Sequence, residues 1–204
     1  KNRQIPRPKP KENEDNDLKI LKSFNQKLGK YIGPKPKNII ENEEKKKRAV
    51  RFDLMLHAYM MVQSGIPMLY SGDEIGQVND YTYKNDPEKR VDSRYIHRGK
   101  FDWKLVDGRK RKGTVQKELF DGIGKLRSIR SKEKVFDASA NVWTLDTWEN
   151  GILGVVRELE GEQMTALFNF AEEDRTAWIE EEGEYMDLYT GKKVSLQAIK
   201  MEGH

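Results

Sequence analysis

The chain has 204 residues, of which 36% are hydrophobic and 35% are charged, so it can bury only a modest core for its length. It contains no cysteine, which excludes disulfides, thiol catalysis and cysteine zinc sites but leaves the cellular compartment open. The net charge of +4 combines a basic and an acidic end: residues 1–50 carry 15 Lys and Arg against 7 Asp and Glu, and residues 137–204 carry 5 against 15. The basic end lacks nucleic-acid-binding motifs and interleaved aromatic residues, so we expect a solvated surface and no nucleic-acid partner.

The first 45 residues are predicted to be a basic segment that is partly helical. Pro6, Pro8 and Pro10 alternate with charged residues, and this pattern favours an extended arm. Apolar residues then recur at three- and four-residue spacing, which indicates a short amphipathic helix from Leu18 to Leu28.

The next part of the chain is typical of one helix-to-strand step of an α/β protein. A longer helix is predicted from about Asn42 to Ser64, with Gly65 placed to end it. Ile66–Tyr70 is apolar on both faces, as in a parallel strand that is covered on both sides. Polar residues, glycine and proline interrupt this apolar stretch, so we expect no membrane span.

Residues 71–113 form a long polar segment without clear periodicity, and such segments are usually functional loops or disordered. A helix is predicted from about Thr114 to Ser131, because apolar residues recur along one of its faces.

After Lys134 the hydrophobic pattern changes to period two, which indicates short strands separated by turns. The expected strands are Val142–Leu145, Ile152–Val156, Thr165–Phe170, Thr176–Ile179, Tyr185–Tyr189 and a run near Ile199. Closely spaced short strands of this kind predict a small antiparallel β-sandwich.

One motif resembles a known family. Residues 65–76 read GIPMLYSGDEIG, which is similar to the last barrel strand of the α-amylase superfamily, glycoside hydrolase family 13. NDY at 79–81, DPEK at 86–89, DSRYIHR at 92–98 and FDW at 101–103 continue the resemblance and look most like amylosucrases and related sucrose-processing enzymes. LFNF at 167–170 resembles a strand of the family's carboxyl-terminal domain.

The resemblance implies an α/β plus all-β fold: the last α/β element of a (β/α)8 barrel, followed by a carboxyl-terminal antiparallel β-sandwich. We therefore divide the chain into a basic segment at 1–45, a barrel remnant at 46–134 and the sandwich at 135–204. Family members act on a glycosidic bond with two carboxyl groups about 5–5.5 Å apart. In the family these acids lie on earlier strands than the eighth, so we expect this chain to lack all catalytic residues.

The loop after the eighth strand lines the pocket in such barrels, and it holds our candidate substrate-binding residues. Asp73 and Glu74 look like a catalytic pair, but neighbouring residues point apart, so we favour a structural or pocket-wall role. Arg94 can clamp a carboxylate with two hydrogen bonds, with Asp92 as its positioning partner or as a turn former. His97 is a further substrate-contact candidate or a structural loop residue.

Other residues with possible chemistry have plainer interpretations. His57 lies in an apolar helix and has no partner at ligand spacing, so we interpret it as a core histidine. Trp103, Trp143, Trp148 and Trp178 could stack on sugars, but tryptophans spaced through a sandwich are more often core. We expect no metal and no cofactor.

The leading hypothesis is a carboxyl-terminal portion of a family 13 hydrolase or glucosyltransferase that acts on sucrose or an α-glucan. The alternatives are a non-catalytic carbohydrate-binding or assembly module and a truncated remnant without activity. Because a lone barrel element exposes apolar surface, we also expect a homodimer formed through residues 66–70.

Overall fold

The computed structural model describes residues 43–180, 183–195 and 198–203, which fall into two compact units. One unit is residues 78–99, and the other combines residues 43–77 with residues 100–203. The predicted arm and the helix from Leu18 to Leu28 lie outside the described residues. No helix among the described residues is long and apolar enough to cross a membrane.

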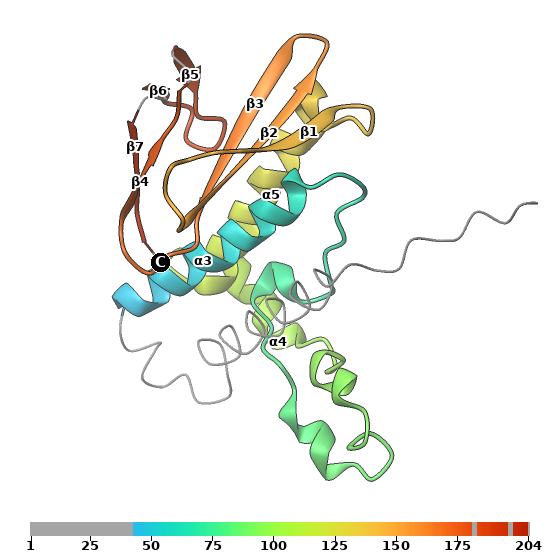
Figure 1. Ribbon diagram of the computed structural model, residues 1–204. Coiled ribbons are helices and arrows are strands. Elements are labelled where there is room, and N and C mark those ends of the chain that lie inside the picture. Colours follow the sequence, from blue (N-terminus) through green and yellow to red (C-terminus); the bar gives the residue numbers. More distant parts are fainter. Residues whose placement is uncertain (1–42, 181–182, 196–197, 204) are drawn as a thin grey trace, which may run out of the picture. The chain divides into compact units, whose positions relative to one another are not determined.

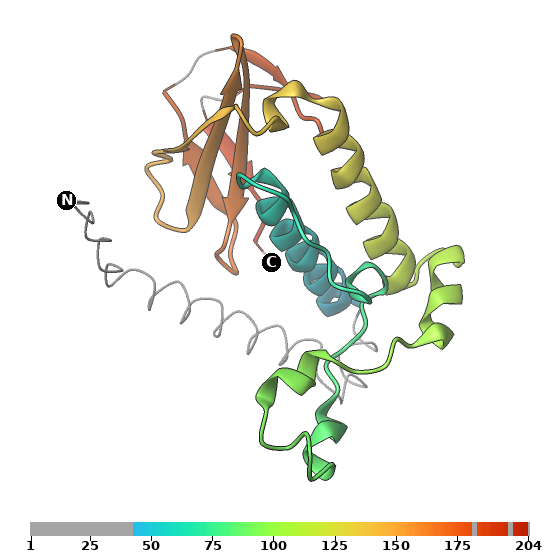
Figure 2. The same ribbon diagram turned by 90° about the vertical axis from the view of Figure 1, so that its right-hand side faces the viewer.

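The larger unit contains two long helices that lie side by side, as Figures 1 and 2 show. Helix α3 spans Glu43–Val62 and helix α5 spans Val115–Lys132, so both predicted helices are confirmed. The Thr114 hydroxyl oxygen accepts the Lys117 N–H at the start of α5 and satisfies one of its free donors. Gly122 of α5 lies against Leu54 of α3, where a Cβ would meet Leu54 Cδ2 at 2.5 Å, so the helices pack closely at this glycine.

Short helical turns occupy the polar segment between the long helices. In the larger unit they are η1 (Asp73–Ile75), α4 (Trp103–Val106) and η4 (Asp107–Lys110), and the smaller unit has η2 (Tyr81–Asn85) and η3 (Ser93–His97). A last turn, η5 (Lys134–Phe136), follows α5. The segment at 71–113 that sequence patterns left unassigned therefore contains four 3-10 turns and one short α-helix, and η2, η3 and α4 begin with side-chain caps.

Three small antiparallel sheets follow. Their strands are β1 (Asn141–Leu145), β2 (Ile152–Leu159), β3 (Glu162–Asn169), β4 (Arg175–Trp178), β5 (Glu184–Met186), β6 (Lys193–Ser195) and β7 (Ala198–Met201). The first sheet has the order β1-β2-β3, β4 pairs with β7, and β5 pairs with β6. The sequence predicts all of these strands except β6, although the strand expected over Tyr185–Tyr189 ends at Met186.

The β1-β2-β3 sheet is covered on both faces. On one face Ile152 packs in a core with Ala177 and Ile179 of the β4 segment. On the other face Val155 and Phe168 pack in a second core with residues of α3, including Val62. The β1-β2-β3 sheet therefore packs on the β4 segment with one face and on the helical part with the other, so this second core includes residues on both sides of the boundary expected at residue 135.

Two arginines hold the carboxyl end of α3. Arg157 of β2 is 1% exposed, and its guanidinium donates to Val62 O at 2.9 Å, Val135 O at 2.6 Å and Asp137 O at 3.1 Å. Arg130 of α5 donates to Met61 O and, at 2.7 Å, to Gly65 O. Since the last turn of α3 has no basic residue of its own, these side chains satisfy carbonyls that the helix leaves free and complement its dipole.

The predicted strand Ile66–Tyr70 is not formed. The segment is extended but forms no strand pairing with any described residue, and Ile66 and Met68 are 87% and 78% exposed. A parallel strand buried on both faces needs neighbouring strands and covering helices, and the described residues supply neither. The prediction of a buried strand is thus wrong for this chain as it stands.

Replacing Arg157 with methionine should lower the free energy of unfolding by about 3 kcal/mol or more. The variant removes the donor from the carbonyls in two buried hydrogen bonds, those of Val62 and Val135, each at a cost of roughly 1–3 kcal/mol, and from the part-buried Asp137 carbonyl. Urea unfolding followed by circular dichroism measures the loss. Arg127→Met, on the exposed face of α5, is the matched control and should change stability by no more than about 0.5 kcal/mol. An Arg157→Met variant as stable as wild type would contradict this role.

Candidate functional site

Asp73 and Glu74 lie in the tight turn that follows the extended segment Ile66–Tyr70. The Asp73 carboxylate accepts the Tyr70 N–H at 3.1 Å, and the Glu74 carboxylate accepts the Gly72 N–H at 3.0 Å. Both side chains therefore bind the backbone of their own turn. This arrangement fits the structural role weighed for them.

The turn requires glycine at both of its ends. Gly72 has φ 106° and Gly76 has φ 62°, a left-handed region that other residues rarely adopt. A Cβ on Gly76 would also meet Leu119 Cδ1 of α5 at 2.9 Å. Between them Ile75 is 1% exposed and anchors the turn in the core. The motif residues thus fix the backbone that presents the two carboxylates.

A buried carboxylate lies near this turn and was missed by the sequence analysis. His57 Nδ1 is 2.9 Å from Asp53 O and 3.4 Å from Asp53 Oδ2, one turn earlier in α3. Their side chains are only 11% and 16% exposed, which confirms His57 as a core histidine. The statement that His57 has no carboxylate partner was wrong, and the four-residue spacing between an Asp and a His in one helix was the available signal.

The environment of Asp53 favours its neutral form. Burial raises the pKa of Asp53 from 3.8 to about 6, His57 opposes this change, and the negative charge of Asp73 adds to it. Charge at the Asp73 turn is therefore coupled to a titrating group inside α3.

The smaller unit holds the other three candidate residues. The Asp92 carboxylate caps η3 by accepting the Arg94 N–H at 3.0 Å. It also binds the Arg94 guanidinium through Nε at 2.9 Å and Nη2 at 2.8 Å. These bonds lower the pKa of Asp92 to about 2, so the pair stays ionised. Asp92 is both a turn former and the positioning partner of Arg94.

Arg94 keeps binding capacity after this pairing. Its side chain is 73% exposed, and its Nη1 has no hydrogen-bond partner within the described part of the chain. His97 is oriented in a similar way, because its Nδ1 lies 3.0 Å from Asn79 Oδ1 and its ring is otherwise exposed. The Asp80 N–H donates to Ile96 O at 2.8 Å, which ties the two ends of this unit together. Arg94 and His97 are thus each positioned by hydrogen bonding on one side, while the other side of the side chain is exposed to solvent.

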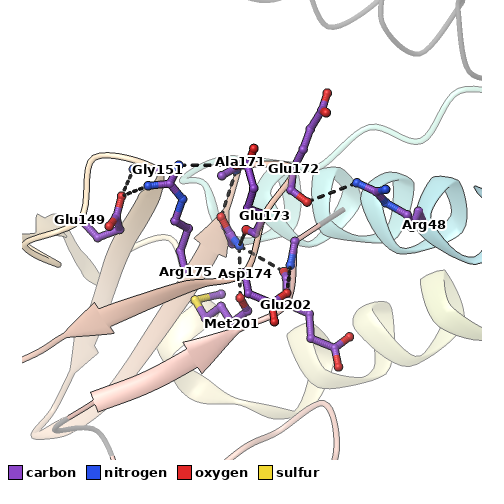
Figure 3. Close-up of polar contacts among 12 residues, drawn as sticks. Arg48, Glu149, Gly151, Ala171, Glu172, Glu173, Asp174, Arg175, Met201 and Glu202 are labelled. Carbon is purple, nitrogen blue, oxygen red and sulfur yellow. Dashed lines mark hydrogen bonds and ion pairs between the residues drawn. The ribbon is translucent and has the colours of Figure 1, made fainter.

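Asn169 of the LFNF motif fixes the carboxyl-terminal strand. Its buried amide nitrogen donates to Glu173 O, Met201 O and Glu202 O at 3.0–3.3 Å, and its oxygen accepts the Ala171 N–H. Figure 3 shows Ala171 and Glu173, in the turn after β3, beside Met201 and Glu202 at the end of β7, with Arg48 of α3 binding Glu172 O next to them. The motif asparagine is therefore a structural residue.

The tryptophans do not form the core, which corrects the interpretation favoured from the sequence. Trp103, Trp143, Trp148 and Trp178 are 75%, 43%, 68% and 56% exposed. Alternation explains Trp178, since Ala177 and Ile179 on either side of it are both buried. Among the residues the structure describes, no three His, Asp or Glu side chains gather as a metal site.

The fold of these elements is similar to a part of several solved sugar-processing enzymes, which fits the resemblance of residues 65–76 to the α-amylase family. Among solved structures, the trehalulose synthase of Pseudomonas mesoacidophila MX-45 is similar with a TM-score of 0.59, 15% identity, and coverage of 74% of this chain and 36% of that enzyme. The trehalose-6-phosphate hydrolase of Bacillus licheniformis (TM-score 0.52, 14% identity, 74% and 37% covered) and an isomaltulose synthase mutant of Erwinia rhapontici NX5 (0.50, 16%, 74% and 36%) are also similar.

This likeness concerns the fold, and the chain spans little more than a third of the length of these enzymes. No protein-family model matches the sequence.

The pKa of Asp53 generates a pH prediction. Its folded pKa is raised, so the folded state holds the proton more tightly than the unfolded state between pH 4 and 6. The free energy of unfolding should therefore fall as pH rises through this window, by up to about 3 kcal/mol from this group. Asp53→Asn should remove that part of the slope and be more stable than wild type at pH 7. Urea unfolding at pH 4, 5, 6 and 7 measures the pH dependence and the difference in stability. The prediction would be contradicted if the free energy of unfolding changed with pH in the same way in the two proteins.

Proposed function

We propose that this chain is the carboxyl-terminal portion of a family 13 glycoside hydrolase or glucosyltransferase that acts on sucrose or an α-glucan. In this proposal residues 46–134 end a (β/α)8 barrel, and residues 135–204 form the β-sandwich that follows it. Residues 71–113 provide one wall of the active site, and the catalytic acids belong to barrel elements outside this chain.

The observation that carries the proposal is the exposed run Ile66–Tyr70. It follows a long helix directly and leads into a rigid, acid-rich turn, which is the order of a barrel's helix, strand and catalytic-face loop. Its apolar side chains are exposed because strands that would flank it are not among the described residues. A barrel would supply those strands on both sides.

The chemistry of the loop supports a sugar substrate. Arg94 and His97 offer hydrogen-bond donors of the kind that bind hydroxyl groups or a carboxylate, since Arg94 Nη1 and the second ring nitrogen of His97 have no partner among the described residues. The neighbours in fold are named as sugar synthases and a sugar-phosphate hydrolase, which points the same way. The closer likeness to amylosucrases rests on the motifs at residues 79–103.

A carbohydrate-binding module without catalysis is the second candidate, and one observation favours it. Three of the exposed tryptophans lie in or between the strands after residue 135, where an enzyme's accessory sugar-binding surface could act without the barrel. An assembly module or an inactive remnant remains the alternative if neither sugar binding nor catalysis is found.

The chain alone should not release sugar from sucrose, maltoheptaose or an aryl α-glucoside, because retaining catalysis needs two carboxyl groups that flank the bond. Asp73 and Glu74 are adjacent and bound to their own turn. The chain produced together with the barrel strands encoded upstream should be active on one of these sugars. Turnover by the 204-residue chain that disappears on mutation of Asp73 or Glu74 would refute the proposal.

In that longer protein Arg94→Ala should lower kcat/KM by about 10–100-fold, because the loop loses its clamp while its backbone caps remain. Arg90→Ala, an exposed arginine of the same loop without a side-chain partner among the described residues, is the matched control and should keep full activity.

The exposed run also predicts self-association of the isolated chain. We propose that two copies meet through Ile66–Tyr70, because open strand edges and apolar faces pair readily. Light scattering over a concentration series should show the mass rising from 23.8 kDa toward twice that value. Met68→Lys should keep the chain monomeric, whereas Val91→Lys, a control at a residue 85% exposed, should not. A chain that is monomeric at every concentration would overturn the dimer.

A further inference from the structure

The loop between β1 and β2 contains a tryptophan in a conformation that costs free energy. Trp148 has φ 52°, in the left-handed region, and its side chain is 68% exposed. A bulky residue in this region is an outlier. The other non-glycine residue with positive φ among the described residues, Glu160, lies in a tight hairpin turn with Gly161, which accounts for it. Trp148 gains no burial that would offset its strain.

The rest of the loop holds Trp148 in this position. The Asp146 carboxylate accepts the Trp148 N–H at 2.9 Å. The buried Thr147 hydroxyl donates to Ile152 O at 2.9 Å, and Thr147 O accepts the Trp178 N–H at 3.0 Å. Strained residues that persist because their surroundings fix them are common at ligand sites.

A further tie comes from β4. Glu149 Oε1 accepts the Gly151 N–H at 3.1 Å and pairs with Arg175 Nη1 at 3.1 Å, and Figure 3 shows this ion pair reaching the loop. The loop is thus fastened to two neighbouring segments, and its shape is preformed.

Trp148 borders a cavity of about 400 Å³ that is lined by Leu145, Asp146, Thr147, Trp148, Glu149, Asn150 and Ile152. This volume lies within the range of roughly 300–1,000 Å³ for small-molecule sites. Asn150 and the second oxygen of Asp146 make no hydrogen bond to any residue in 43–180, 183–195 or 198–203, so both remain available. The cavity combines one exposed indole with unused polar groups.

We propose that this cavity binds a pyranose ring of an α-linked glucan oligosaccharide. A pyranose has an apolar C–H face that can lie on the Trp148 indole and a rim of hydroxyls that can bond to Asp146 and Asn150. Aromatic side chains provide such contact area while leaving polar neighbours to fix orientation. The choice of an α-glucan rests on the proposed function, while the geometry of the site does not.

Isothermal titration of the 204-residue chain with maltoheptaose tests the site directly. The chain should bind, and Trp148→Gly should weaken binding about tenfold or more through loss of the indole. Because glycine adopts positive φ without strain, the same variant should melt at an equal or higher temperature than wild type. Trp143→Ala removes an exposed tryptophan of β1 outside the cavity lining and should keep wild-type affinity.

Absence of binding by wild type, or unchanged binding by Trp148→Gly, would overturn the proposal. A lower melting temperature of that variant would assign Trp148 a structural role instead. Equal binding of cellohexaose would overturn the α-glucan preference. Binding requires no catalytic acid, so its failure is separable from that of the proposed function: an active longer protein whose carboxyl-terminal chain ignores maltoheptaose would remove this site alone.

Discussion

A single buried guanidinium connects the helical and the sheet parts of this chain. Arg157 belongs to β2, yet its three hydrogen bonds end on α3 and on the connection after α5. No carboxylate among the described residues pairs with it; the free carbonyls and the negative end of α3 balance its charge, with the Phe136 ring 5.5 Å away. The core around Val155 also contains Val62, whose carbonyl Arg157 binds.

This contact has a functional meaning, because α3 leads directly into the turn that carries Asp73 and Glu74. The sheet holds α3 at its carboxyl end through Arg157, and Arg48 holds its amino-terminal half through Glu172 O. The strands are therefore a support for the helix that precedes the candidate site. In the function proposed above, the β part would therefore support the candidate site without taking part in the chemistry.

The spacing of apolar residues was sufficient to predict α3, α5 and the longer strands, because the residues that cover these elements also lie in the described part of the chain. β6 was missed because Lys193–Ser195 is only three residues long and gives no measurable alternation. The burial of Ile66–Tyr70 could not be predicted from these residues alone. An apolar pattern implies neighbouring strands and helices that cover the segment, but it does not show that they are present. Trp148 was interpreted as core because tryptophans spaced through a sandwich usually are, whereas it lies exposed in the loop between β1 and β2 with a left-handed backbone. Arg94 and Asp92 were paired correctly because their two-residue spacing is a local turn property.

The open backbone at residues 66–70 has a consequence for how long the chain survives. Proteases bind their substrates as extended strands, and this run already has that shape, with exposed apolar side chains and no sheet partner among the described residues. Strand pairing would hide the same bonds from cleavage. The lifetime of this polypeptide in a cell therefore depends on whether neighbouring strands reach it before a protease does.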